Sequence, residues 1–183
     1  MRASRLGLLA VLLCLPGSLS GQGGVSLEYR VKAAYLVNFA RYITWSESDE
    51  PAPGDPLSIC VLGEDPFGTV LDSLIRGRQI DGHPLAARRV RTAAEADDCQ
   101  LVFLTHSEWT RRPELLKELS RPGVVTIGES EAFGRAGGVI SFVISNETVR
   151  FTVNLAARDR AGVRISSRVL SLATVVFGPE ERR

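Results

Sequence analysis

The residue types that most often carry out catalysis are scarce in this chain. Its only two histidines are His83 and His106. His106 and Ser107 follow an apolar segment, a position where open α/β sheets often place ligand sites. The sequence has no Gly-x-Ser-x-Gly turn to present a nucleophile, and neighbours along the chain do not form a catalytic triad. We therefore interpret His106 as a surface-loop residue and predict that the protein has no catalytic residues and is not an enzyme.

The sequence also gives little indication of a metal site or of a phosphate-binding site. Neither histidine belongs to a group of His, Cys and carboxylate side chains at metal-ligand spacing, so we predict no metal. Residues 63–68 have the order of a phosphate-binding loop but lack its full glycine pattern and its lysine. Glu64 and Asp65 in this segment would also repel an anion. Glycines in residues 134–138 precede an apolar segment and predict a turn. We predict that the protein has no cofactor.

The N-terminus has the three parts of a secretory signal peptide. Arg2 and Arg5 are followed by an apolar stretch over residues 6–15 and then by small and polar residues. The apolar stretch is about half the roughly 20 residues that a transmembrane helix needs. We expect cleavage after Ser20 or Gly21. The predicted organisation is a signal peptide over residues 1–21 and one domain over residues 22–183, exported to the periplasm.

Removal of this leader leaves an even number of cysteines. Of the three cysteines, Cys14 lies in the leader, and Cys60 and Cys99 remain. An even pair in an exported protein favours a disulfide. The alternative is two buried free thiols, since cysteine packs well as a small hydrophobic residue.

The overall charge argues against two classes of binding protein. The sequence has 22 basic and 21 acidic residues, and loss of Arg2 and Arg5 with the leader brings the net charge to about −1. This balance gives no support to nucleic-acid or anionic-membrane binding. A hydrophobic content of 44% indicates a folded domain with a substantial core.

The pattern along the mature chain predicts an α/β domain. Apolar spacing predicts a buried helix over residues 27–45. From residue 57 onward, short apolar segments alternate with helical ones. The short polar link at Asn146 and Glu147 predicts a hairpin, so the sheet should be mixed. We predict a single domain with a mixed, mostly parallel sheet of about six strands flanked by helices. The expected strands are residues 57–62, 83–90, 100–104, 124–127, 139–144 and 149–155.

Four stretches in register resemble one known family. They are residues 28–36 with Asn38, Phe39 and Trp45, residues 60–63 with 65–68, residues 137–140 with Phe142, and residues 149–151 with 154–157 and 165–170. In this order the chain resembles the YfiR-like family of bacterial periplasmic proteins along nearly all of its mature length.

The resemblance implies an exported α/β domain that is stabilised by a disulfide, with the family's bridge expected at Cys60 and Cys99. It also implies a regulator without catalytic groups. Such a protein binds the periplasmic part of an inner-membrane diguanylate cyclase and represses it, which lowers cyclic-di-GMP and affects biofilm formation. The implied partner is such a cyclase, or a sensor kinase with a periplasmic domain, and we expect the chain to form a homodimer.

A second hypothesis is a periplasmic sensor that binds a small molecule. Polar residues on otherwise apolar elements would then line its pocket or contact a partner. The candidates are Asn38 and Arg41 on the first helix and Arg150, Asn154 and Arg168 in the last third of the chain. Each has a simpler interpretation, because Asn38 could bond within the core and the arginines could be solvated.

Overall fold

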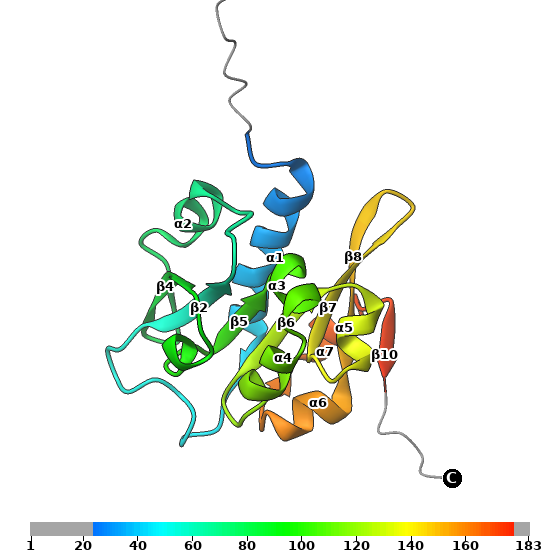
Figure 1. Cartoon of the computed structure of the whole chain (residues 1–183). Coiled ribbons are helices and arrows are strands. Elements are labelled where there is room, and N and C mark those ends of the chain that lie inside the picture. The colour runs from blue at the N-terminus through cyan, green and yellow to red at the C-terminus, as the bar shows by residue number, and fades with distance from the viewer. Residues whose placement is uncertain (1–23, 178–183) are drawn as a thin grey trace, which may run out of the picture.

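The computed structural model describes residues 24–177, so the predicted leader lies outside the described residues. One large sheet dominates this part of the chain (Figure 1). Its strands are β2 (Leu57–Leu62), β3 (Gln79–Ile80), β4 (His83–Val90), β5 (Leu101–Leu104), β6 (Val125–Glu129), β7 (Ile140–Ser145), β8 (Thr148–Asn154) and β10 (Val175–Phe177).

The sheet is mixed and mostly parallel, as predicted. Its strand order is β10-β8-β7-β6-β5-β2-β4-β3. Only β7 with β8 and β3 with β4 pair antiparallel; the other neighbours are parallel. The prediction of a single α/β domain is confirmed. The sheet has two strands more than expected, because β3 and β10 at its edges are too short for a period-two pattern to reveal them.

Helices cover both faces of the sheet. The longest is α1 (Leu27–Tyr42), and the shorter ones follow the strands in sequence. They are α2 (Thr69–Ile75), a 3-10 turn (Ala94–Ala96), α3 (His106–Arg111), α4 (Glu114–Leu119), α5 (Glu131–Arg135), α6 (Leu155–Arg160) and α7 (Ser167–Leu170). A separate two-stranded ladder pairs β1 (Ile43–Thr44) with β9 (Arg164–Ile165).

Helix α1 is shorter than its apolar pattern predicted. The Ser26 side chain accepts a hydrogen bond from Tyr29 N and caps the first turn. At the other end, Ile43 adopts extended dihedral angles (φ −106°, ψ 136°) and pairs with Ile165. The prediction that the helix reaches residue 45 was wrong, because this ladder takes up residues 43 and 44 while keeping Ile43 buried.

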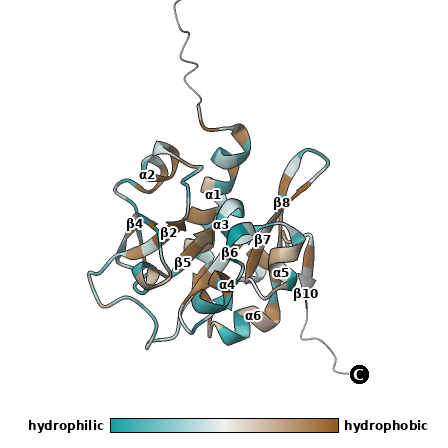
Figure 2. Cartoon of the chain, viewed as in Figure 1, coloured by the Kyte–Doolittle hydropathy of each residue, from teal (hydrophilic) through white to brown (hydrophobic). Residues whose placement is uncertain are grey.

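Alternation along the central strands divides the core into two layers. In β2, Ile59 and Val61 face the layer that contains α1, α2 and α7, whereas Cys60 and Leu62 face the layer that contains α4 and α5. All six residues of β2 are buried, as expected for a strand covered on both faces. Figure 2 shows the strands in the middle of the sheet as strongly hydrophobic.

The two remaining cysteines form a disulfide in the layer beside α4. Cys60 lies in β2 and Cys99 lies two residues before β5, with their Cα atoms 6.0 Å apart. Both side chains are buried. The expected pairing is therefore present, and the bond links two segments that are also neighbours in the sheet.

Two glycines make room for a buried aromatic ring on α5. A Cβ at Gly128 or at Gly138 would overlap the ring of Phe133. Gly137 has a φ of +111°, which supports the predicted turn. Gly138 N donates to the carbonyl oxygen of Phe133 across this turn, and the absence of a side chain at Gly138 also makes room for the Phe133 ring.

Candidate functional site

The usual ligand position of this type of sheet is occupied by the protein's own side chains. Ligands of open α/β sheets bind at the carboxyl ends of the strands, where the strand order reverses. Here the order reverses between β2 and β5. Gly63 follows β2, and a Cβ at this position would overlap the side chains of Thr105 and Glu108. The crevice between these two strands is therefore filled.

The Glu108 side chain in this crevice is held by two arginines, which lie three and four residues further along the chain. Its carboxylate accepts hydrogen bonds from Arg112 Nε (3.1 Å) and Arg112 Nη2 (2.7 Å) and pairs with Arg111. The hydrogen bonds from Arg112, together with the charge of Arg111, lower the pKa of the Glu108 carboxyl from its ordinary value.

Acidification is expected to weaken the fold through Glu108. A carboxyl with a lowered pKa in the folded state stabilises the fold above its unfolded pKa of about 4.3, and this contribution is lost as the pH falls through the folded pKa. The difference in unfolding free energy between wild type and Glu108→Gln should therefore be constant from about pH 7 to about pH 5 and shrink below about pH 4. Urea titrations at each pH measure it. Glu114→Gln, at an exposed position on α4, is the control. If the difference in unfolding free energy between wild type and Glu108→Gln is undiminished at the lowest pH, the pKa of Glu108 is not lowered in the folded state.

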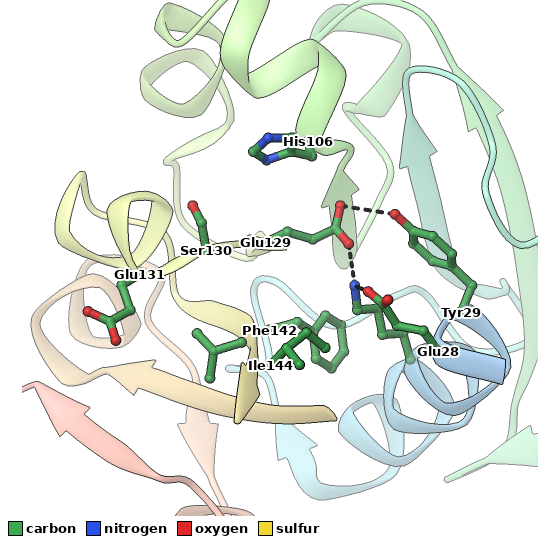
Figure 3. A pocket seen from close by; sticks show the side chains of 10 residues that line it. Glu28, Tyr29, His106, Glu129, Ser130, Glu131, Phe142 and Ile144 are labelled. Carbon is green, nitrogen blue, oxygen red and sulfur yellow. Dashed lines mark hydrogen bonds and ion pairs between the residues drawn. The ribbon is translucent and has the colours of Figure 1, made fainter. Parts of the chain in front are cut away.

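A cavity lies one strand further along the same edge, beside the carboxyl end of β6 (Figure 3). Its volume is about 470 Å³, within the range of roughly 300–1,000 Å³ that is typical of small-molecule sites. The first turns of α1 and the outer part of β7 form its other walls. The lining residues are Glu28, Tyr29, Lys32, His106, Glu129, Ser130, Glu131, Phe142, Val143 and Ile144.

A buried lysine organises one wall of this cavity. The Lys32 side chain is only 3% exposed, and its Nζ pairs with both Glu28 and Glu129. Glu28 lies one turn earlier on α1, whereas Glu129 is the last residue of β6. A buried ammonium needs such partners, because an unpaired charge in the interior is strongly unfavourable. The ion cluster therefore connects the first helix to the middle of the sheet.

Tyr29 completes this ion cluster. Its hydroxyl donates to Glu129 Oε2 at 3.5 Å, and its ring centroid lies 4.6 Å from Lys32 Nζ. Burial, reinforced by the charge of Glu129, raises the pKa of the Tyr29 hydroxyl above its ordinary value. The hydroxyl is therefore a protonated donor at neutral pH. The same ring makes an edge contact with Phe67, with ring centroids 5.7 Å apart.

The remaining walls of the cavity are apolar or weakly polar. Phe142 and Ile144 on β7 form its floor in Figure 3, and Ile144 is 55% exposed. His106, the first residue of α3, lies on the side of the cavity opposite to Phe142 and Ile144. Ser130 caps α5 by accepting a hydrogen bond from Phe133 N. His106 is exposed, as predicted, but it begins a helix instead of lying in a loop, and it lines the cavity.

The charged side chains that line the cavity are mostly acidic. Three glutamates, Glu28, Glu129 and Glu131, face a single lysine, Lys32, so the lining carries an excess of negative charge. The hydroxyl of Ser130 is directed to the start of α5. Within residues 24–177, no group of three or more His, Cys, Asp or Glu side chains is arranged to hold a metal ion.

The structure places two of the five predicted contact residues together. Asn38 and Arg168 line a second cavity of about 320 Å³ between α1 and α7. Its other lining residues are Tyr35, Phe39, Tyr42, Phe151, Val169 and Leu172. Arg41 and Arg150 are exposed and lie outside this cavity.

The fifth predicted residue, Asn154, has structural contacts. Its Oδ1 accepts from Ala157 N at 2.9 Å and caps α6, and its Nδ2 donates to the carbonyl oxygen of Gly134 at 2.9 Å. Both ends of the amide are thus bonded within the protein. These bonds hold the start of α6 against the last turn of α5.

Sequence reasoning missed the ion cluster, although one signal was present. Lys32 lies four residues before Leu36 and seven before Phe39, so it shares their helix face. A lysine in an apolar stripe requires a partner. Glu28 was available at the preceding turn, but Glu129 is 97 residues away in sequence, and only the sheet brings it into contact.

The fold is that of an α/β domain with a cavity beside the carboxyl end of β6. The chain belongs to the YfiR/HmsC-like family, which matches it over residues 29–174. The predicted family is thus confirmed. The YfiR-like family is known for periplasmic regulators of diguanylate cyclases and is regulatory and not catalytic.

Two solved structures show limited similarity to the chain. One is the ABC domain in complex with L-Trp from Streptococcus pneumoniae, with 14% identity, a TM-score of 0.46, and coverage of 66% of this chain and 56% of that chain. The other is a conserved domain protein from Vibrio cholerae, with 13% identity, a TM-score of 0.44, and coverage of 65% and 54% respectively. The match spans little more than half of either relative. None of the helices described here combines the length and hydrophobicity that a membrane span requires.

Proposed function

We propose that this chain is a non-enzymatic periplasmic regulator. It binds the periplasmic part of an inner-membrane signalling enzyme, a diguanylate cyclase, and represses it, so that cyclic-di-GMP falls. The observation that carries this proposal is the family match over residues 29–174. The predicted signal peptide over residues 1–21 and the Cys60–Cys99 disulfide support a location in an oxidising compartment.

Deletion of the gene is expected to raise cellular cyclic-di-GMP, because the cyclase loses its repressor. Mass-spectrometric quantification of the nucleotide in the deletion strain measures this. Expression of the full chain should restore the original level. A matched variant that begins at residue 22 behind a start methionine, and so lacks the predicted leader, should fail to do so.

Two results would contradict the proposal. Cyclic-di-GMP that is unchanged by the deletion would argue against control of a cyclase. Restoration by the leaderless variant would argue against action in the periplasm. Crosslinking of the mature chain in intact cells, followed by recovery from membranes, identifies the partner and also tests the expected homodimer.

A second candidate function is a periplasmic sensor for a small molecule. The cavity of about 470 Å³ beside β6 favours it, because its size and its mixture of apolar and charged walls are typical of ligand sites. The two functions are compatible, since a ligand can change the affinity of a regulator for its partner.

A further inference from the structure

The lysine in the wall of the cavity beside β6 is already paired with two carboxylates. Lys32 Nζ has three donors, and two of them are taken by Glu28 and Glu129. Its other surroundings are aromatic, with the ring centroids of Tyr29 at 4.6 Å and Phe142 at 5.9 Å. An incoming anion would therefore meet a buried lysine whose charge is already balanced by two carboxylates.

Negative charge remains available in the same cavity. An ionised carboxylate has about four acceptor positions, and Glu129 uses two, for Lys32 and Tyr29. Glu131, at the rim, is 63% exposed and pairs only with the equally exposed Arg135. The side chain of Glu129 is 11% exposed, so a cation that reached it would be partly shielded from water.

The floor of the cavity is suited to an apolar group. Phe142 is buried below the cavity, while Ile144 is an exposed large hydrophobic residue on the outer half of β7. An apolar body lying on both residues would remove the Ile144 side chain from water. The acidic wall and the apolar floor adjoin one another in Figure 3.

We propose that this cavity binds an organic ammonium cation with a short apolar body. The ammonium donates to the carboxylate of Glu129, the charge of Glu131 at the rim attracts the cation, and the body lies against Phe142 and Ile144. This inference rests on the second candidate function, the sensor. Its failure is distinguishable from that of the repressor proposal, because binding is measured on the pure protein and repression is measured in cells.

Three probes with the same five-carbon chain test the charge preference. They are 1,5-diaminopentane, n-pentylamine and glutarate, titrated into the disulfide-bonded mature chain at constant pH and ionic strength. Calorimetry and thermal unfolding report binding. Both amines are expected to bind and to raise the melting temperature, whereas glutarate should do neither. If neither amine binds, or if glutarate binds as tightly as the amines, the proposal is wrong.

Variants locate the site. Glu131→Gln should weaken amine binding by about threefold to fivefold, the effect of one partly exposed ion pair. Ile144→Trp should block binding without a change of charge, because the larger ring occupies the cavity. Glu118→Gln, on the exposed face of α4 away from the cavity, is the charge-matched control. If Glu118→Gln weakens binding as much as Glu131→Gln, or if Ile144→Trp binds like wild type, the ammonium is not bound in this cavity.

Discussion

Loss of the Cys60–Cys99 disulfide is expected to lower the free energy of unfolding by about 4 kcal/mol. The bond closes a loop of 39 positions, and in the chain-entropy model an open loop of this size gives the unfolded state that much additional freedom. Many domains have a total stability of only about 5–15 kcal/mol. Urea unfolding of the oxidised and the reduced mature chain measures the difference.

The reduced wild type is the best reference for this experiment, because it retains both sulfur atoms and isolates the effect of the bond. The double variant Cys60→Ala/Cys99→Ala should be less stable still, since both side chains are buried and their removal leaves space in the core. Unfolding midpoints that coincide for the oxidised and reduced forms would contradict the prediction.

Replacing Lys32 with methionine is expected to destabilise the protein by about 3–5 kcal/mol. The methionine side chain is unbranched and one atom shorter than that of lysine, and it leaves Glu129 buried without its cation. Most of the loss is the cost of this unpaired carboxylate, so Lys32→Met/Glu129→Leu should recover a large part of it. Chemical unfolding of the two single variants and the double variant gives the coupling energy.

The control for the lysine substitution is Lys117→Met on α4, where the side chain is exposed. This change should alter stability by no more than about 0.5 kcal/mol. If Lys32→Met lowers the free energy of unfolding as little as Lys117→Met does, the ion cluster contributes little to the stability of the fold. If the double variant is as unstable as the sum of the single ones, Lys32 and Glu129 are not coupled.

The sequence predicted the elements whose apolar residues repeat over several positions. Strands β2 and β4 have the predicted bounds, because six or eight residues are enough for burial to leave a pattern. The edge strands β3 and β10 have two or three residues and could not be found in this way. Helix α3 was missed as well, since only six polar and mixed residues form it and their pattern resembles that of a loop.

The candidate site was harder to predict than the fold. The groups that line its cavity come from α1, α3, β6 and β7, and only the strand order brings them together. The sequence around Lys32 could reveal a charged residue on an apolar helix face, but it could not reveal the distant partner Glu129. It could also suggest polar candidates such as Asn38 and Arg168, which do share a second cavity. Which of these residues contact a ligand or a partner stays a prediction.

The order of the segments along the chain would let the disulfide form before the last strands are available. Helix α1 emerges first, yet it packs against β8 and α7, which emerge last. Helix α2 and strand β2 can cover part of α1 early, but the part of its apolar face that contacts β8 and α7 stays exposed until the last third of the chain is available, a stage at which chains aggregate readily. Cys60 and Cys99 are both available well before β7 and β8. Their bond can hold β2 beside β5 early, so that the late segments dock on a sheet whose centre is already aligned.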